Sequence, residues 1–79
     1  MPTLLLQDGF RFFFYSNDHD PPHVHVEYGQ GSAKVDLMPD ITIVSVRNMG
    51  KKETKKMLSI ITKHHTEFLA AWQNFFNQK

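Results

Sequence analysis

The N-terminal residues have the pattern of a β-hairpin, in which two apolar runs flank a short polar turn. Residues 3–7 and 10–15 form two apolar runs, and Asp8-Gly9 lies between them. Asp-Gly is a preferred pair for a two-residue type I′ turn, because both central residues of that turn need positive φ. The resulting register pairs Gln7 with Phe10, Leu5 with Phe12 and Leu4 with Phe13.

Three more apolar runs follow, and each is bounded by residues that favour turns. They predict strands at residues 23–28, 33–37 and 41–46. From residue 51 the period changes, because apolar side chains recur at spacings of three and four, as in an amphipathic helix. One continuous helix over residues 51–77 would be about 40 Å long. The predicted fold class is α+β: an antiparallel β-meander of about five strands (two hairpins) with one long C-terminal helix packed on one face.

The aromatic run at residues 10–15 is apolar on both sides of its predicted strand. Phe10, Phe12 and Phe14 fall on one side, and Phe13 and Tyr15 fall on the other. A strand of this kind needs cover on both faces of its sheet, and one helix covers only one. We therefore expect a homodimer or a hetero-oligomer. The alternative is that the surplus aromatic side chains are half exposed, which small proteins tolerate.

The 79 residues predict a single domain that spans residues 1–79. The sequence has no cysteine, so any metal site has to use nitrogen and oxygen ligands. No apolar run is long enough for a signal peptide or a membrane span. We expect a soluble, cytoplasmic protein without membrane contacts.

Charge is unevenly distributed along the chain. Residues 1–50 carry three basic and six acidic side chains, whereas residues 51–79 carry six lysines and two glutamates. Basic side chains on a helix are candidates for contacts to a nucleic-acid backbone, although they often form only a solvated face. The candidates for binding phosphate or nucleic acid are Arg11, Arg47, Lys55 and Lys56.

The stretch DHDPPHVHVEY (residues 18–28) contains three of the five histidines. Strand alternation places His23 and His25 on the same face, and the preceding loop can bring His19 and Asp18 near them. Pro21-Pro22 makes the approach to His23 stiff. This arrangement is compatible with a polar site at the start of a strand.

Three chemical interpretations of this segment remain open. His19, His23 and His25 offer the three imidazoles that a catalytic zinc commonly uses, so a divalent metal is one alternative. Two imidazoles near neutral pKa, with Asp18 orienting one ring, could instead cleave phosphodiesters by acid–base catalysis without metal or other cofactor. The third interpretation is solvated strand residues without special chemistry. His64 also falls on the apolar arc of the predicted helix, where it either joins His23 and His25 or finds a local partner.

The chain resembles a small bacterial family known as domain of unknown function 4160. The resemblance rests on Asp18-His19-Asp20-Pro21-Pro22-His23-Val24-His25 after an aromatic strand, and on His64 eight residues before Trp72. It implies a neighbouring gene of domain of unknown function 2442, in a pairing that looks like a type II toxin–antitoxin operon. The present chain would then be the toxin, and an antitoxin-like protein encoded nearby would be its partner.

The expected function is therefore a toxin that acts on RNA as a metal-independent ribonuclease. The candidate catalytic residues are His19, His23, His25, His64 and Asp18. Two alternatives are a non-enzymatic protein- or nucleic-acid-interaction module and a small metal-binding protein.

Overall fold

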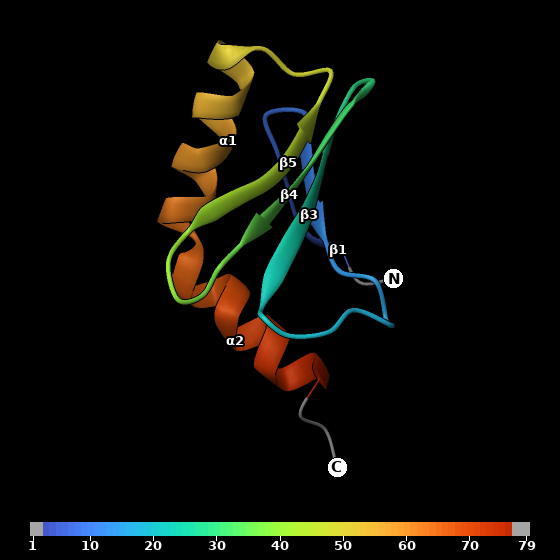
Figure 1. The fold of residues 1–79 in the computed structure, drawn as a ribbon, viewed down its shortest axis with the longest axis vertical. Helices are drawn as coiled ribbons and strands as arrows, with labels where there is room; N and C mark the ends of the chain where they lie inside the picture. Colours follow the sequence, from blue (N-terminus) through green and yellow to red (C-terminus); the bar gives the residue numbers. More distant parts are fainter. Residues whose placement is uncertain (1–2, 77–79) are drawn as a thin grey trace.

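The computed structural model describes residues 3–76, which form one antiparallel sheet with two helices on one of its faces (Figure 1). The sheet order is β1-β2-β3-β4-β5, so every strand pairs with its neighbour in the sequence. The strands are β1 (Thr3–Gln7), β2 (Phe10–Phe13), β3 (His23–Tyr28), β4 (Gly31–Asp36) and β5 (Thr42–Arg47). The predicted α+β class and five-stranded meander are confirmed. None of the helices in the described part is long and apolar enough to cross a membrane.

The first hairpin has the predicted two-residue turn. Asp8 and Gly9 have φ values of 53° and 85°, as a type I′ turn requires. Gln7 pairs with Phe10 and Leu5 with Phe12, as predicted, but Thr3 rather than Leu4 lies opposite Phe13. The register shifts between Thr3 and Leu5, which is the signature of a β-bulge.

The second hairpin fixes the neighbours of the histidine segment. Tyr28 pairs with Gly31 across a two-residue turn, so β4 begins two residues earlier than predicted. This register places His25 opposite Lys34 on β4 and opposite Phe13 on β2. Residues that are directly opposite in a ladder point to the same side of the sheet. His25 therefore has an aromatic neighbour on one strand and a cationic neighbour on the other.

The prediction of one long C-terminal helix is wrong, because the helical region consists of α1 (Lys51–Lys63) and α2 (His65–Phe76). The break lies at His64, whose ψ of 17° departs from helical values. Residues 62–66 are threonine, lysine and histidine, most of which are weak helix formers. The ring of His65 also bonds the Leu37 carbonyl oxygen at 2.8 Å, which ties the start of α2 to the end of β4. The predicted helix end at residue 77 lies outside the described residues.

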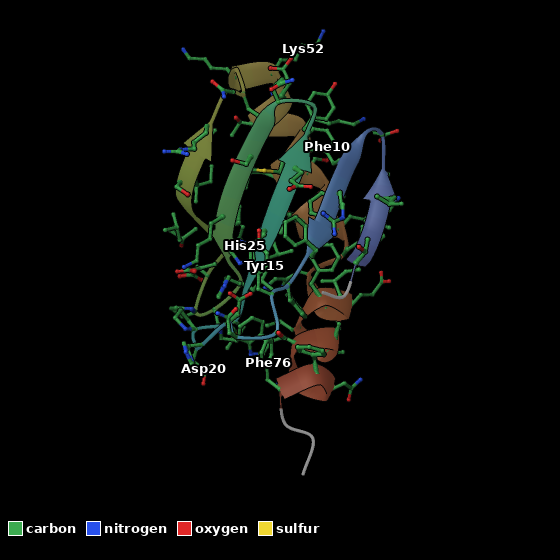
Figure 2. The ribbon with its side chains drawn as sticks, turned by 90° about the vertical axis from the view of Figure 1, so that its right-hand side faces the viewer. Phe10, Tyr15, Asp20, His25, Lys52 and Phe76 are labelled. Carbon is green, nitrogen blue, oxygen red and sulfur yellow. The ribbon has the colours of Figure 1, made fainter. Side chains whose placement is uncertain are left out.

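The core lies between the helices and one face of the sheet. Strand side chains such as Phe12, Val26 and Val35 pack there against Met57 and Ile61 of α1. The opposite face, here called the open face, is turned away from the helices and toward the viewer in Figure 2. It bears Arg11, Phe13, His25, Glu27, Ser32, Lys34, Ser45 and Arg47.

The second face of the aromatic strand is covered largely by the chain itself. Phe13 is buried beneath the guanidinium group of Arg11, which lies 4.3 Å from its ring centroid. The rings of Tyr15 and His25 lie 5.3 Å and 5.6 Å from the Phe13 ring. Phe14 turns to the other side and contacts Trp72 of α2 at 5.0 Å. Assembly with a second chain stays a prediction, but Phe13 gives no argument for it.

Candidate functional site

The candidate site lies where β3 begins, beside the loop of residues 14–22 and close to α2 (Figure 1). His23 and His25 are the first and third residues of β3, so their side chains point to the same side, as the sequence predicted. Their ring centroids are 5.0 Å apart. The loop folds back over the strand through a turn in which Asp18 N–H donates to the Tyr15 carbonyl oxygen at 3.1 Å. This turn brings the Asp18 carboxylate to both imidazoles.

The Asp18 carboxylate is the centre of the cluster. The Tyr15 backbone N–H donates to Asp18 Oδ2 at 2.8 Å, and His25 Nε2 lies 3.1 Å from the same oxygen. Burial by itself raises the pKa of the Asp18 carboxyl, but the Tyr15 hydrogen bond and the nearby His25 and His23 rings outweigh it and lower that pKa below its ordinary value. Asp18 is therefore ionised at neutral pH and accepts hydrogen bonds only.

His25 is held by one hydrogen bond and two aromatic neighbours. Its Nε2–H donates to the ionised Asp18 carboxylate. The imidazole stacks on Phe13 and meets Tyr15 edge-on at 4.6 Å between ring centroids. Figure 2 shows His25 beside Tyr15 on the open face. The His25 side chain keeps 19% of its surface exposed, so solvent reaches the cluster on this side.

His23 is almost completely buried, with 4% of its side-chain surface exposed. Its Nδ1 lies 2.9 Å from the Pro21 carbonyl oxygen, and a carbonyl only accepts, so the proton is assigned to Nδ1. The other nitrogen, Nε2, lies 3.3 Å from Asp18 Oδ1 without the geometry of a hydrogen bond. Trp72 packs on the ring at a centroid distance of 5.0 Å. The His23 ring is thus fixed, and its free nitrogen points to Asp18.

A cleft of about 330 Å³ opens beside the cluster. Asp18 forms part of its wall, and α2 contributes the opposite wall. The lining residues are Asp18, His19, Asp20, Pro22, Trp72, Gln73 and Phe76. His19 is exposed in this cleft, so the structure places it next to the cluster but outside the Asp18–His23–His25 contacts.

His64 is not brought to the cluster. Its Nδ1 lies 2.9 Å from Glu67 Oε1, and its ring stacks on Phe68 at 5.9 Å. Among the described residues its Nε2 has no hydrogen-bond partner and is buried. From the sequence, His64 was expected either to join His23 and His25 or to find a local partner. The structure shows the second arrangement, with Glu67 as the partner.

The predicted basic residues fall into two separate groups. Arg11 and Arg47 share the open face with His25, and Arg11 bonds Glu27 at 2.9 Å. Lys55 and Lys56 lie on α1, on the other side of the sheet. There they line a larger cavity of about 490 Å³ with Phe10 and Tyr28, and Lys56 pairs with Asp8 at 3.5 Å. No residue of the histidine cluster lines this larger cavity.

Sequence reasoning missed Lys34 as a member of the open face. Lys34 lies directly across from His25 on the neighbouring strand, which is the closest cross-strand position in an antiparallel ladder. The signal was the turn at Gly29-Gln30, where Gly29 has a φ of 56°. A two-residue turn there sets the His25–Lys34 register, whereas the predicted strand bounds of 23–28 and 33–37 left the register of the two strands open.

The family model of domain of unknown function 4160 matches residues 9–73, which is most of the chain. The match covers Gly9 of the first turn, the histidine segment and Trp72. Among curated proteins and among solved structures, no match was found. The description of the family names no activity, so the activity has to be inferred from the site.

Proposed function

We propose that this chain, which belongs to the family of domain of unknown function 4160, cleaves phosphodiester bonds in RNA at the Asp18–His23–His25 cluster. In this proposal it is the toxin of a toxin–antitoxin pair, and an antitoxin-like protein encoded nearby is its partner. The resemblance to toxin-type gene pairs supplies the biological role. The chemistry is argued from the cluster and its surroundings.

The observation that carries the proposal is the convergence of two imidazoles on one carboxylate, beside an uncovered face that carries more cationic than acidic side chains. Lys34 is the cross-strand neighbour of His25, and Arg11 and Arg47 lie one row further along the strands. RNA presents a regular row of negative charges, and cationic side chains on an open surface neutralise them. Tyr15, exposed beside His25, adds an aromatic surface on which an unpaired base can stack.

In the proposed mechanism only one of the two imidazoles, that of His25, acts as the general base. His23 is almost completely buried, its Nδ1 is bound to the Pro21 carbonyl, and its Nε2 faces Asp18 rather than solvent, so this ring is not placed to reach an RNA oxygen. His25 gives its Nε2–H to Asp18, so its Nδ1 carries the lone pair that can accept a proton. His25 is then the base that removes the proton from the attacking oxygen, and Asp18 orients it. The attacking oxygen bonds to phosphorus as the bond between phosphorus and the leaving oxygen breaks, and the leaving oxygen takes a proton from solvent water.

The first experiment measures cleavage of a labelled RNA by purified protein. Substitution His25→Ala is expected to slow cleavage by about 10²–10⁴-fold, the usual contribution of a general base. If wild type and His25→Ala leave the RNA equally intact, the enzyme proposal is wrong and an interaction module becomes the better explanation.

A matched pair of lysine variants tests where the RNA lies. Lys34→Ala is expected to raise KM and to reduce the salt dependence of binding, because one phosphate contact is lost from the open face. Lys55→Ala removes the same charge from the other side of the sheet and should leave both unchanged. Equal effects from the two substitutions would contradict binding on the open face.

The toxin role is tested in cells. Growth is followed after induced expression of wild type and of His25→Ala, each with and without the neighbouring gene. Growth arrest by wild type alone, relieved by the neighbour and absent in the variant, is the expected result. Equal growth of all four strains would exclude the toxin role.

A further inference from the structure

We infer that Asp18, His23 and His25 together bind one divalent transition-metal ion of the zinc or iron(II) class. The ion would lie between Nε2 of His23, Nε2 of His25 and the Asp18 carboxylate. This inference deepens the proposed function, on whose site it rests, by naming the cofactor class of that site. With the ion in place, Nδ1 of His25 would carry the ring proton, so water on the ion would take the role of base from His25. It differs from the ligand set expected from the sequence, because Asp18 takes the place of His19.

The spacing of the three ligand atoms fits an ion of this class. One atom from each side chain can be chosen so that all three lie within 4.8 Å of one another. Asp18 oxygens lie 3.1 Å from His25 Nε2 and 3.3 Å from His23 Nε2. A tetrahedral ion with bonds of about 2.0–2.1 Å keeps neighbouring ligand atoms roughly 3.3–3.4 Å apart. Both separations between imidazole and carboxylate are therefore near those of a bound ion, and the two imidazole nitrogens would have to lie at most about 1.5 Å closer to each other.

His23 gives the second, independent observation. Its Nε2 is buried and has no hydrogen-bond partner among the described residues, although it is aimed at a carboxylate. The Pro21 carbonyl holds the proton on Nδ1, which leaves the Nε2 lone pair directed at the cluster. Metal-binding histidines characteristically donate their second ring N–H to a carbonyl or carboxylate in this way. An ion would give the unpartnered nitrogen its partner.

The other two ligands are positioned before any ion arrives. The Tyr15 N–H fixes the Asp18 carboxylate at 2.8 Å, and Phe13 and Tyr15 enclose the His25 ring. On binding, the ring proton of His25 would move through solvent from Nε2 to Nδ1, so that the neutral imidazole presents its Nε2 lone pair to the ion. Pre-positioned ligands lose little conformational freedom on binding, so the entropic cost of ordering them is small and the ion binds more tightly.

The donor set selects the class of ion. Two imidazoles and one carboxylate are typical ligands of zinc and of non-haem iron(II), whereas calcium and magnesium prefer oxygen ligands alone. Three protein ligands leave at least one coordination position open, as in catalytic sites. Asp18 lies in the wall of the 330 Å³ cleft, so one of the three ligands adjoins a space that a substrate can enter. An ion there makes its bound water a nucleophile near neutral pH.

The test uses untagged protein from which metal has been removed, because an affinity tag of histidines binds the same ions. Zn²⁺ is titrated in a calorimeter, and Co²⁺ is added in parallel because its absorption spectrum reports the ligands and geometry. The expected result is one ion per chain. Asp18→Asn and His25→Gln should each weaken binding more than about 100-fold, beyond the 10–100-fold that loss of an outer partner costs.

Two histidine variants are matched controls. His19→Ala removes an exposed imidazole beside the cluster, and His64→Ala removes the other ring with an unpartnered buried nitrogen. Both should bind Zn²⁺ as wild type does. Circular dichroism of every variant confirms that the fold is kept, and Asp18→Asn retains the oxygen that accepts the Tyr15 N–H.

Three results would overturn the inference: no ion bound by wild type, unchanged binding in Asp18→Asn, or lost binding in His19→Ala. The last would indicate the histidine-only ligand set. Because binding is measured without RNA, this inference and the proposed function fail separately. If the protein binds an ion but leaves RNA intact, the metal site is supported and the nuclease proposal is wrong. If the protein binds no ion but cleaves RNA, the nuclease proposal is supported and the metal site is wrong.

Discussion

Removal of the buried Trp72 side chain should destabilise the protein much more than removal of Phe75, a partly exposed aromatic side chain on the same helix. Trp72 is buried to within 4% exposure and contacts Phe14 at 5.0 Å, Phe76 at 4.2 Å and the His23 ring at 5.0 Å. With Phe68 it is one of two buried residues on α2. Replacement of such a residue by alanine costs about 3–5 kcal/mol, from lost burial and the cavity that remains.

That cost is large for a chain of this size. At about 0.05–0.15 kcal/mol per residue, the whole domain is stable by roughly 4–12 kcal/mol. Trp72→Ala therefore removes a large part of the free energy of unfolding and leaves some molecules unfolded at room temperature. Trp72→Phe keeps an aromatic ring in the same place and should cost about 1–2 kcal/mol less than alanine. Its effect stays measurable if the alanine variant does not fold.

Urea unfolding followed by circular dichroism is the suitable assay, because these variants lack the protein's one tryptophan and its fluorescence. Phe75→Ala is the matched control, since Phe75 is on the same helix but 36% exposed, and it should cost about 1 kcal/mol or less. Equal losses for Trp72→Ala and Phe75→Ala would refute the reasoning, because α2 would then not be anchored through Trp72.

Further predictions concern a tight turn, an exposed cation and the proposed ion. A Cβ on Gly31 would lie 2.7 Å from the backbone oxygen of Asn48, so Gly31→Ala should lower the free energy of unfolding by about 1–3 kcal/mol in urea titrations. Gly29→Asn is its control, because nothing lies within 4 Å there and asparagine tolerates positive φ. Arg11→Ala should cost about 1 kcal/mol, from the contact with Phe13 and a partly exposed ion pair with Glu27. A cost near zero in the same titration would mean that Arg11 does not cover Phe13. Zn²⁺ at about 100 times its Kd should stabilise wild type by about 2.7 kcal/mol in thermal unfolding, and Asp18→Asn should show no such gain.

Features set by neighbouring residues were predictable from the sequence. The Asp8-Gly9 turn follows from the positive φ that a type I′ turn needs, and it fixed two of the three predicted pairs. The common side of His23 and His25 follows from strand alternation alone. The third pair failed because the bulge near Leu4 depends on how β1 meets β2 further along, which no local signal records.

Features set by distant contacts were not predictable. The helix ends at His64 partly because His65 bonds a carbonyl 28 positions away, and a helical wheel contains no such information. Likewise Asp18 rather than His19 joins the two imidazoles, because the turn onto Tyr15 decides which loop side chain faces β3. Adjacency in sequence suggested both residues equally, and only the backbone path separates them.

Two histidines have a buried Nε2 without a hydrogen-bond partner among the described residues, and the comparison between them locates the site. The His64 ring stacks on Phe68 and bonds Glu67 through Nδ1. Within residues 3–76, its Nε2 is left without a hydrogen bond because the ring packs into the helix break. The His23 nitrogen instead points to a carboxylate that a second imidazole also contacts. A buried polar atom is costly wherever it lies. A helix break explains one unpartnered nitrogen, as at His64, but it gives no reason for three ligand atoms to meet. Binding of an ion requires such a meeting, and His23 Nε2 lies beside two further ligand atoms.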